Sequence, residues 1–305
     1  MAEACPPRCV LGATMPEVHD TIAGFRWALD AERQAGRSIG FTPTMGYLHE
    51  GHASLMRAAA SECDVAVASI FVNPLQFAAN EDLSTYPRDL ERDLSLCDSS
   101  GVAHVLAPSV DEMYPGGPVL TTVTVTQITR RFEGAVRPEH FAGVATVVAK
   151  LFSIVGPCRA YFGEKDFQQL AMVRRLAADL SLPVTVIGCP TVREDDGLAM
   201  SSRNVYLTTP QRAAAPLIRQ ALVAAASAAA AAGATVASVE SVVADAVAAS
   251  PEAQLDYVAL VDARTLEPAV SVAGDQRLVV AARFGRTRLL DNIAIASLDS
   301  LGSLA

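Results

Sequence analysis

The sequence predicts an α/β protein in two parts, an open parallel sheet with helices over residues 1–190 and a smaller α+β domain over residues 191–305. Two observations predict the first part. Short apolar runs rich in β-branched residues alternate with helical periodicity, and the connections between runs are long enough for helical crossovers. A third observation predicts the second part: the alternation stops near residue 190, where two helical stretches precede three strand-like runs.

The first part is predicted as parallel strands joined by helices. Strands are expected at 38–43, 64–73, 101–108, 159–165 and 183–192, and helices at 53–62, 141–155 and 167–180. The run TTVTVTQITR at 121–130 indicates an additional strand or hairpin arm outside this core. Ligands of open α/β sheets lie at the carboxyl ends of the strands, so the residues that follow each run are candidates for a site.

The second part begins with a helical stretch at 208–233, which opens with a threonine cap and a proline at the first helical position. Pro216 falls inside this pattern, so the helix is expected to kink or restart there. A second helix is expected at about 235–249. Three strands, at 255–262, 277–284 and 287–295, complete the α+β domain.

Composition limits the classes of partner. The net charge of −9 argues against a general nucleic-acid binder, which needs a basic face. Six cysteines are scattered without a disulfide framework, and Cys5 and Cys9 lack a second pair for a zinc site, which indicates reduced thiols. Residues 1–20 have no apolar core typical of a signal peptide, and the uncharged stretch 221–239 is too alanine-rich for a membrane span. We therefore expect a cytoplasmic protein without a membrane segment.

Two histidines, His49 and His52, lie three residues apart in the segment HEGH, where an extended run becomes a helix. A zinc-protease helix places its histidines four apart and has a third ligand downstream. Here no further ligand is placed to complete a tetrahedron, because His19, His104 and His140 are isolated in the sequence. Zinc is therefore not expected at this turn.

Phosphate suits the same turn better. A strand-to-helix junction presents free N–H groups and the positive end of the helix dipole, and Met45-Gly46 lets the backbone approach a ligand closely. Two imidazoles there can donate hydrogen bonds to phosphate oxygens and gain charge as negative charge develops. The chain contains neither GxxxxGK[ST] nor GxGxxG, which excludes the commonest nucleotide cradles.

Two other polar loops follow predicted strands. GEKDFQQL places Lys165 and Asp166 at a strand end, where they can meet a phosphate and a ribose hydroxyl or metal ion. REDDGLAMSSRN groups Ser201, Ser202 and Arg203, two hydroxyls and a fork-shaped cation, which suit a triphosphate. Taken alone, the first loop also fits a solvated turn and the second an interdomain linker.

Six ordered blocks together resemble the pantothenate synthetase (pantoate–β-alanine ligase) family: PTMGYLHEGH, SIFVNPLQF, YPRDLERD, FEGAVRPEHFAGVATVV, YFGEKDFQQL and PTVREDDGLAMSSRNVYL. The resemblance runs from about residue 39 to 207, and TRLLDN agrees near the C-terminus. The HxGH turn and the MSSR loop resemble the signatures of the wider HIGH-type nucleotidyltransferases. The resemblance implies a Rossmann-like ATP- and pantoate-binding domain followed by a partial lid.

The resemblance also implies a reaction: ATP-dependent condensation of (R)-pantoate with β-alanine through a pantoyl-adenylate, releasing AMP and pyrophosphate. His52 matches the usual proton donor, and with it His49, Lys165, Ser201, Ser202 and Arg203 are the implied catalytic residues. The implied ATP-binding residues are Met45, Gly46, Tyr47, Leu48, His49, Glu50, Gly51, His52, Gly163, Glu164, Lys165, Asp166, Val192, Met200, Ser201, Ser202 and Arg203.

Gln76, Gln169 and Arg137 are the implied pantoate-binding residues, and Gln76 with Asn73 would serve β-alanine. Neutral amides bind the substrate without a salt bridge that would blunt the attacking oxygen. Mg²⁺ and a homodimer are implied as well.

Three positions depart from the family pattern. Tyr47 replaces a small alanine, and Phe167 replaces a tyrosine. In YPRDLERD, Arg92 replaces one of two expected acidic residues and leaves Asp93 as the magnesium candidate. Two other functions stay open on the residues alone: an adenylyltransferase that acts on a phosphorylated acceptor, and a nucleotide sensor that has kept the fold.

Overall fold

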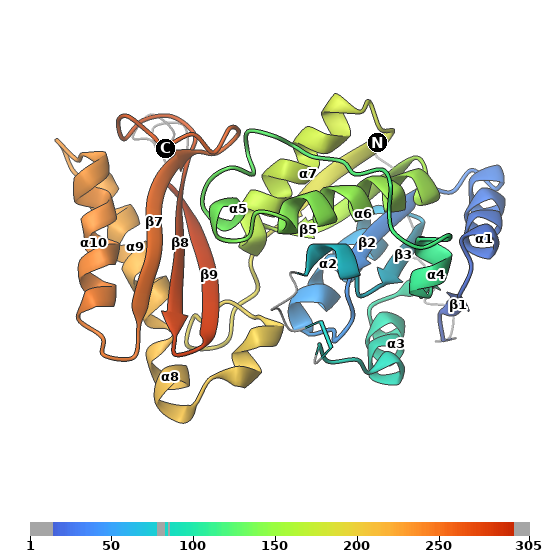
Figure 1. Ribbon diagram of the computed structural model, residues 1–305, viewed down its shortest axis with the longest axis horizontal. Helices are drawn as coiled ribbons and strands as arrows, with labels where there is room; N and C mark the ends of the chain where they lie inside the picture. The colour runs from blue at the N-terminus through green and yellow to red at the C-terminus, as the bar shows by residue number, and fades with distance from the viewer. Residues whose placement is uncertain (1–14, 78–82, 85, 296–305) are drawn as a thin grey trace, which may run out of the picture.

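The computed structural model describes residues 15–77, 83–84 and 86–295 (Figure 1). Its first sheet contains β1 (Glu17–His19), β2 (Ile39–Thr44), β3 (Val65–Ile70), β4 (Val102–Leu106), β5 (Cys158–Gly163) and β6 (Val184–Cys189). All are parallel, in the order β1-β4-β3-β2-β5-β6. The open parallel sheet predicted from the alternating pattern is thus confirmed.

Helices cover both faces of this sheet and supply its crossovers. They are α1 (Ile22–Gln34), α2 (Glu50–Glu62), α3 (Leu90–Ser99), α4 (Val110–Met113), α5 (Glu133–Val136), α6 (His140–Val155) and α7 (Phe167–Asp179). β3 is buried at five of its six positions, as expected for a central parallel strand that reads as one apolar run.

Two segments of the first domain approach each other closely and form one wall of the candidate functional site. The short 3-10 helix η1 (Pro74–Gln76) lies against α6. A Cβ on Gly143 of α6 would lie 2.2 Å from the Leu75 carbonyl oxygen, so only glycine permits this contact. The approach holds Gln76 beside the end of β2, where its Nε2 lies 2.7 Å from Met45 Sδ.

The second domain packs two helices on a three-stranded antiparallel sheet (Figure 1). Its elements are α8 (Thr209–Ala214), α9 (Leu217–Ala229), α10 (Val236–Ala248), β7 (Gln254–Asp262), β8 (Gln276–Phe284) and β9 (Thr287–Ile295). The predicted helix does restart at Pro216, between α8 and α9. None of the helices within the described ranges is both long and apolar enough to cross a bilayer.

Three sequence expectations need correction. Residues 121–125 run without strand pairing and 126–129 form turns, because the Val123 N–H donates to the Thr146 hydroxyl of α6, not to a neighbouring strand. Strand β1 and helices α1 and α3 add to the elements that the sequence predicts. β1 pairs with β4 and brings His19 within 3.2 Å of His104, so these two histidines are not isolated.

Candidate functional site

The turn between β2 and α2 has an unusual backbone that a buried carboxylate holds. Gly46 and Tyr47 have φ angles of 84° and 51°, in the left-handed region. Asp93, 1 % exposed, accepts hydrogen bonds from the Tyr47 and Leu48 N–H groups, each at 2.7 Å. Burial raises the pKa of Asp93, while these two hydrogen bonds oppose the shift.

Asp93 therefore has a positioning role in this turn, and its expected role as a magnesium ligand stays a prediction. Both of its carboxylate oxygens are engaged by the backbone of the turn. Across the described ranges, it belongs to no group of three side chains that could share a metal ion. Asp93 shapes the HxGH turn from beneath.

The two histidines of this turn are fixed by the start of α2. His49 is the N-cap, and its Nδ1 accepts the Gly51 N–H at 3.1 Å. His52 Nδ1 accepts the His49 N–H at 3.3 Å, which closes a capping box. Because a backbone N–H can only donate, each neutral ring carries its proton on Nε2. Gly51 is required here, since a Cβ would lie 2.8 Å from His49 Cε1.

Both rings are neutral at ordinary pH. Burial lowers the pKa of His49 to about 4, and Lys165 lowers it further. Burial also lowers the pKa of His52 to about 3, and His49, whose ring centroid is 4.2 Å away, adds to the shift. The pair therefore offers two Nε2–H donors, which suit an anion.

A cavity of about 820 Å³ lies between the two domains and is lined by residues of both. Eight of the predicted site residues line it: Met45, Gln76, Arg137, Lys165, Asp166, Gln169, Ser201 and Arg203. The others lie outside its lining: Gly46, Tyr47, Leu48, His49, Glu50, Gly51, His52, Asn73, Asp93, Gly163, Glu164, Val192, Met200 and Ser202. Lys165 and Asp166 nevertheless influence the pKa of both turn histidines, so turn and cavity share one electrostatic environment.

Gln76 is held in the cavity wall by Asn73. Asn73 is 1 % exposed, and its Nδ2 donates to Gln76 Oε1 and to the Gly143 carbonyl, both at 3.2 Å. Its Oδ1 accepts the Tyr114 hydroxyl at 2.8 Å. With its amide engaged on both sides, Asn73 positions Gln76, and its expected contact with β-alanine stays a prediction.

Two basic side chains approach the backbone of Gln76. Arg137 Nη2 donates to the Gln76 carbonyl at 3.3 Å, and His140 Nδ1 lies 3.0 Å from the same oxygen. His140 also lines the cavity, so it too is not isolated. Arg137 thus stands beside the amide that the resemblance assigns to pantoate.

The C-terminal sheet contributes residues that the sequence did not single out. Asn292 Nδ2 donates to the Glu164 and Lys165 carbonyls, both at 2.9 Å, and so fixes the loop that carries Lys165. Arg193 forms a two-pronged ion pair with Asp291 at 2.7 and 2.9 Å. Asp291 and Asn292 belong to the block TRLLDN, so the signal was present in the sequence without an assigned role.

A second interdomain network closes the other end of the cavity. Glu133 is 8 % exposed and accepts hydrogen bonds from the Tyr257 hydroxyl at 2.8 Å and from Arg288 Nη1 at 2.5 Å. Arg283 and Arg286 also line the cavity from this domain. The buried glutamate is paired with the guanidinium, so its charge is not left uncompensated.

Two of the departures from the family pattern are explained by contacts with arginines. The Arg92 guanidinium lies 5.1 Å from the Tyr47 ring centroid, so two of the unusual residues contact each other. Arg277 lies 4.4 Å from the ring centroid of Phe167 and pairs with Glu164 at 2.8 Å. Both are cation–π geometries.

Comparisons with known proteins agree on one family. The family model described as pantoate-beta-alanine ligase matches residues 17–294. A pantothenate synthetase of Rhizobium meliloti is 57% identical over 277 residues, covering 90% of this chain and 95% of the relative. One of Heliobacterium modesticaldum is 51% identical over 269 residues, covering 88% and 95%.

Solved structures give the same result. The pantothenate synthetase of Thermus thermophilus has a TM-score of 0.86 and 50% identity, with 92% of this chain and 99% of that chain covered. A pantoate-beta-alanine ligase from Francisella tularensis, complexed with beta-gamma ATP and beta-alanine, has a TM-score of 0.74 and 33% identity, with 92% and 97% covered. The chain therefore belongs to the pantoate–β-alanine ligase family.

Proposed function

We propose that the cavity between the two domains is where this chain activates pantoate and joins it to β-alanine. As a member of the family, the chain is a ligase that condenses (R)-pantoate with β-alanine at the expense of ATP, giving pantothenate, AMP and pyrophosphate. A carboxylate does not react directly with an amine, because its oxygen is a poor leaving group. A pantoyl-adenylate intermediate removes this obstacle.

In the first step, a pantoate carboxylate oxygen attacks the α-phosphorus of ATP, and the bond from that phosphorus to pyrophosphate breaks. Negative charge grows on the phosphoryl oxygens, where fixed N–H donors and cations stabilise it most. His49 and His52 would donate from Nε2, with Lys165, Ser201, Ser202 and Arg203 completing the set. The turn backbone of Met45–Gly51, the loop Gly163–Asp166, and Val192 and Met200 would enclose the rest of the ATP.

The position of the histidine protons supports this assignment. Both Nδ1 atoms already accept backbone N–H groups, so the outward Nε2 atoms must carry the protons. A low pKa in the free protein means that His52 acts first as a neutral hydrogen-bond donor. As negative charge develops on the phosphoryl oxygens, the Nε2–H···O hydrogen bonds would strengthen, so the neutral rings would stabilise the transition state as fixed donors.

Gln76, Gln169 and Arg137 would hold pantoate. Both amides and the guanidinium line the same cavity as Lys165 and Arg203, and this common lining is the observation that carries the proposal. In the second step the β-alanine amine attacks the acyl carbon of the adenylate and AMP departs. Gln76 is retained as the β-alanine contact, with Asn73 as its support.

Mg²⁺ would enter as part of the nucleotide substrate. Asp93 is engaged by the turn backbone, and Asp166 lies 3.3 Å from the Lys165 ammonium. These residues do not form a dedicated magnesium cage. That agrees with the usual habit of Mg²⁺, which binds phosphates and water with at most one or two carboxylates.

We also propose a homodimer, a C-terminal domain that acts as a partial lid from about residue 191, and a cytoplasmic location. An exposed extended segment supports the dimer: Leu120 is 97 % exposed, and residues 121–125 have no strand partner within the described chain. Four unpaired thiols, Cys63, Cys97, Cys158 and Cys189, fit a reducing compartment. Sedimentation equilibrium tests the dimer, which a monomer of 32.0 kDa would refute.

One experiment separates the ligase from the two alternatives. The purified protein is incubated with MgATP and pantoate, with and without β-alanine, and AMP, pyrophosphate and pantothenate are measured. A ligase makes pantothenate only with β-alanine. An adenylyltransferase ignores β-alanine, and a nucleotide sensor makes no AMP. The neutral Gln76 and Gln169 amides favour the ligase, because a phosphorylated acceptor needs additional cations.

A further inference from the structure

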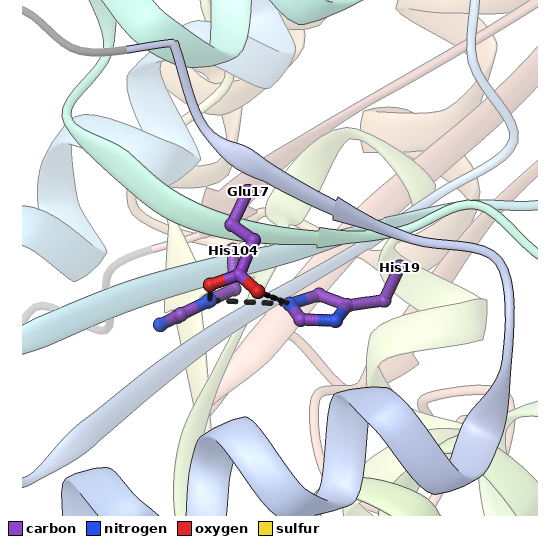
Figure 2. A group of neighbouring side chains, drawn as sticks. All are labelled: Glu17, His19 and His104. Atoms are coloured by element: carbon purple, nitrogen blue, oxygen red, sulfur yellow. Dashed lines mark hydrogen bonds and ion pairs between the residues drawn. The ribbon is translucent and has the colours of Figure 1, made fainter.

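A second group of titratable side chains lies away from the cavity, at the β1 edge of the parallel sheet (Figure 2). Glu17 and His19 are two residues apart on β1 and therefore point to the same face. His104 on β4 is the register partner of Glu17. Two strands, β4 and β3, separate β1 from β2, which leads into the HxGH turn.

The three side chains aim potential ligand atoms at one point. His19 Nε2 lies 3.2 Å from His104 Nδ1, and the Glu17 carboxylate lies 3.3 Å from His104 Nδ1 and 3.9 Å from His19 Nε2. All three ligand atoms lie within 4.8 Å of one another. Around a tetrahedral Zn²⁺ with bonds of about 2.0–2.1 Å, neighbouring ligand atoms are separated by about 3.3 Å. The spacing matches.

Protons alone satisfy this arrangement poorly. If both facing ring nitrogens were protonated, two N–H groups would oppose each other at 3.2 Å. If neither were protonated, three lone-pair-bearing atoms would converge. A single proton on His104 Nδ1 must be divided between His19 Nε2 at 3.2 Å and the Glu17 carboxylate at 3.3 Å, as one bifurcated hydrogen bond. A cation at the centre satisfies all three atoms together.

We propose that Glu17, His19 and His104 bind a divalent transition-metal ion of the Zn²⁺ type, which fastens β1 to β4. Two imidazoles and a carboxylate are ligands for such ions, whereas Mg²⁺ and Ca²⁺ prefer oxygen alone. His19 and His104 are each 8 % exposed, while the Glu17 side chain is largely exposed, so a water can complete the tetrahedron from the solvent side.

The surroundings prepare the rings for this role. His104 Nε2, the nitrogen that would not bind the metal, lies 3.6 Å from Glu32 Oε1 of α1. A carboxylate behind a ligating histidine is the usual supporting arrangement in zinc sites. The His19 ring packs edge-on against Phe25 of α1, with centroids 5.5 Å apart.

The metal would serve the fold and not the ligation. β1 has only three residues, and each pairs with β4 alone. A site that joins the two strands and is backed by α1 would hold this short edge strand in place. Metal binding should therefore raise the melting temperature of the protein.

The test uses full-length protein stripped of metal with EDTA and titrated calorimetrically with ZnCl₂ in the absence of nucleotide. Glu17→Gln removes an exposed ligand without disturbing the core, and His104→Asn removes a buried one. Asp20→Asn is the matched control, because Asp20 is exposed and contributes charge to His19 but is not a ligand. We expect one site per chain. Glu17→Gln and His104→Asn should each weaken it at least about tenfold, and Asp20→Asn less than about threefold.

Two further measurements, the melting temperature and the Co²⁺ absorption spectrum, distinguish coordination by these three residues from other causes of Zn²⁺ binding. Zn²⁺ at a concentration that saturates the parent but lies below the Kd of Glu17→Gln should raise the melting temperature of the parent and of Asp20→Asn, and that of Glu17→Gln much less. Co²⁺ should give a spectrum of nitrogen and oxygen ligands without a thiolate charge-transfer band. Unchanged Zn²⁺ affinity in Glu17→Gln, equal weakening in Asp20→Asn, or a thiolate band would each overturn the proposal.

Discussion

Two pairs of histidines lie close together in the chain, His49 with His52 and His19 with His104. The pairs differ in the partners of their Nδ1 atoms. In the HxGH turn, both Nδ1 atoms accept backbone N–H groups, so the rings turn Nε2–H donors outward. At the sheet edge, His104 Nδ1 instead faces His19 Nε2 and the Glu17 carboxylate. The first pair suits an anion and the second a cation, although the residue type is the same.

Spacing in the sequence separates the pairs for a physical reason. His49 and His52 are three residues apart at a helix start, where free N–H groups are abundant and capture the ring nitrogens. His19 and His104 are 85 residues apart and meet across two paired strands, away from any helix start. Their facing ring nitrogens lie 3.2 Å apart, so they contact each other and not a cap N–H.

Among the substitutions that test the difference between the two histidine pairs, removal of His52 should have the largest effect. His52→Ala deletes an Nε2–H donor that we place on the reacting phosphate, and AMP formation with ATP and pantoate should fall about 10²–10⁴-fold. His52→Asn restores an acceptor for the His49 N–H but places no donor at the position of Nε2, so it should keep the melting temperature and still lose the rate. An AMP-forming rate within threefold of the parent in both variants contradicts the assignment.

Two adjacent glutamines sharpen the difference between a ligand contact and a structural one. Gln169 lines the cavity, and Gln169→Ala should raise the KM for pantoate about tenfold with little loss of stability. Gln168 also lines the cavity, but its amide is engaged within the protein: it donates to the Ile128 and Arg131 carbonyls at 2.8 and 2.9 Å and accepts the Glu133 N–H at 3.1 Å. Gln168→Ala should instead lower the free energy of unfolding by about 1–3 kcal/mol. If Gln169→Ala changes only the KM for ATP, pantoate is misplaced.

Acid should weaken the fold through the HxGH pair. The pKa of His49 is lowered to about 4 and that of His52 to about 3, so between these values and 6.5 the unfolded chain binds more protons than the folded one. Their contribution to stability is thus present above pH 6.5 and is lost as the pH falls below it. Melting temperatures from pH 7 to 4.5, without ligands, should show this decline. His49→Asn/His52→Asn should flatten it, and an equally steep decline in that variant would contradict these pKa values.

The sequence predicted the strands and helices that follow from a local residue pattern. It missed the contacts that depend on pairing between distant segments. The strands β2 to β6 and the helix restart at Pro216 follow from apolar runs and a proline, and the structure has them. β1 has three residues, which are too few to form a recognisable strand pattern. The His19–His104 contact could therefore not be predicted from the sequence.

The same division applies to the site. Asp93 sits in a family block, but its hydrogen bonds to a turn 45 residues earlier can be read only from the fold. Asn292 also lies in a family block, yet its partners, the Glu164 and Lys165 carbonyls, are more than 120 residues away. Long-range hydrogen bonds to backbone atoms leave no residue-type signature in a single sequence.

Loosening the loop that carries Lys165 should have a moderate effect. Asn292→Ala removes the two hydrogen bonds to the carbonyls of 164 and 165, so kcat should fall about three- to tenfold while the KM for pantoate stays within twofold. Steady-state kinetics with both substrates varied measures this. Asn204→Ala, which also removes amide bonds in the polar loop of 193–204 but none to Lys165, is the comparison variant. Equal losses of kcat in the two variants would mean that no specific support of Lys165 exists.

The smallest expected effect concerns the outer side of the HxGH turn, where Tyr47 and Arg92 contact each other. An exposed cation–π pair of this kind contributes about 0.5–1 kcal/mol, and its geometry here is 5.1 Å from guanidinium to ring centroid. A double-mutant cycle with Tyr47→Ala, Arg92→Ala and both together should return a coupling energy of that size in urea unfolding. Tyr47 has a positive φ, but alanine meets the same strain there, so the cycle cancels it. A coupling energy below about 0.2 kcal/mol would show that the two departures from the family pattern are independent, and that Asp93 alone holds the turn.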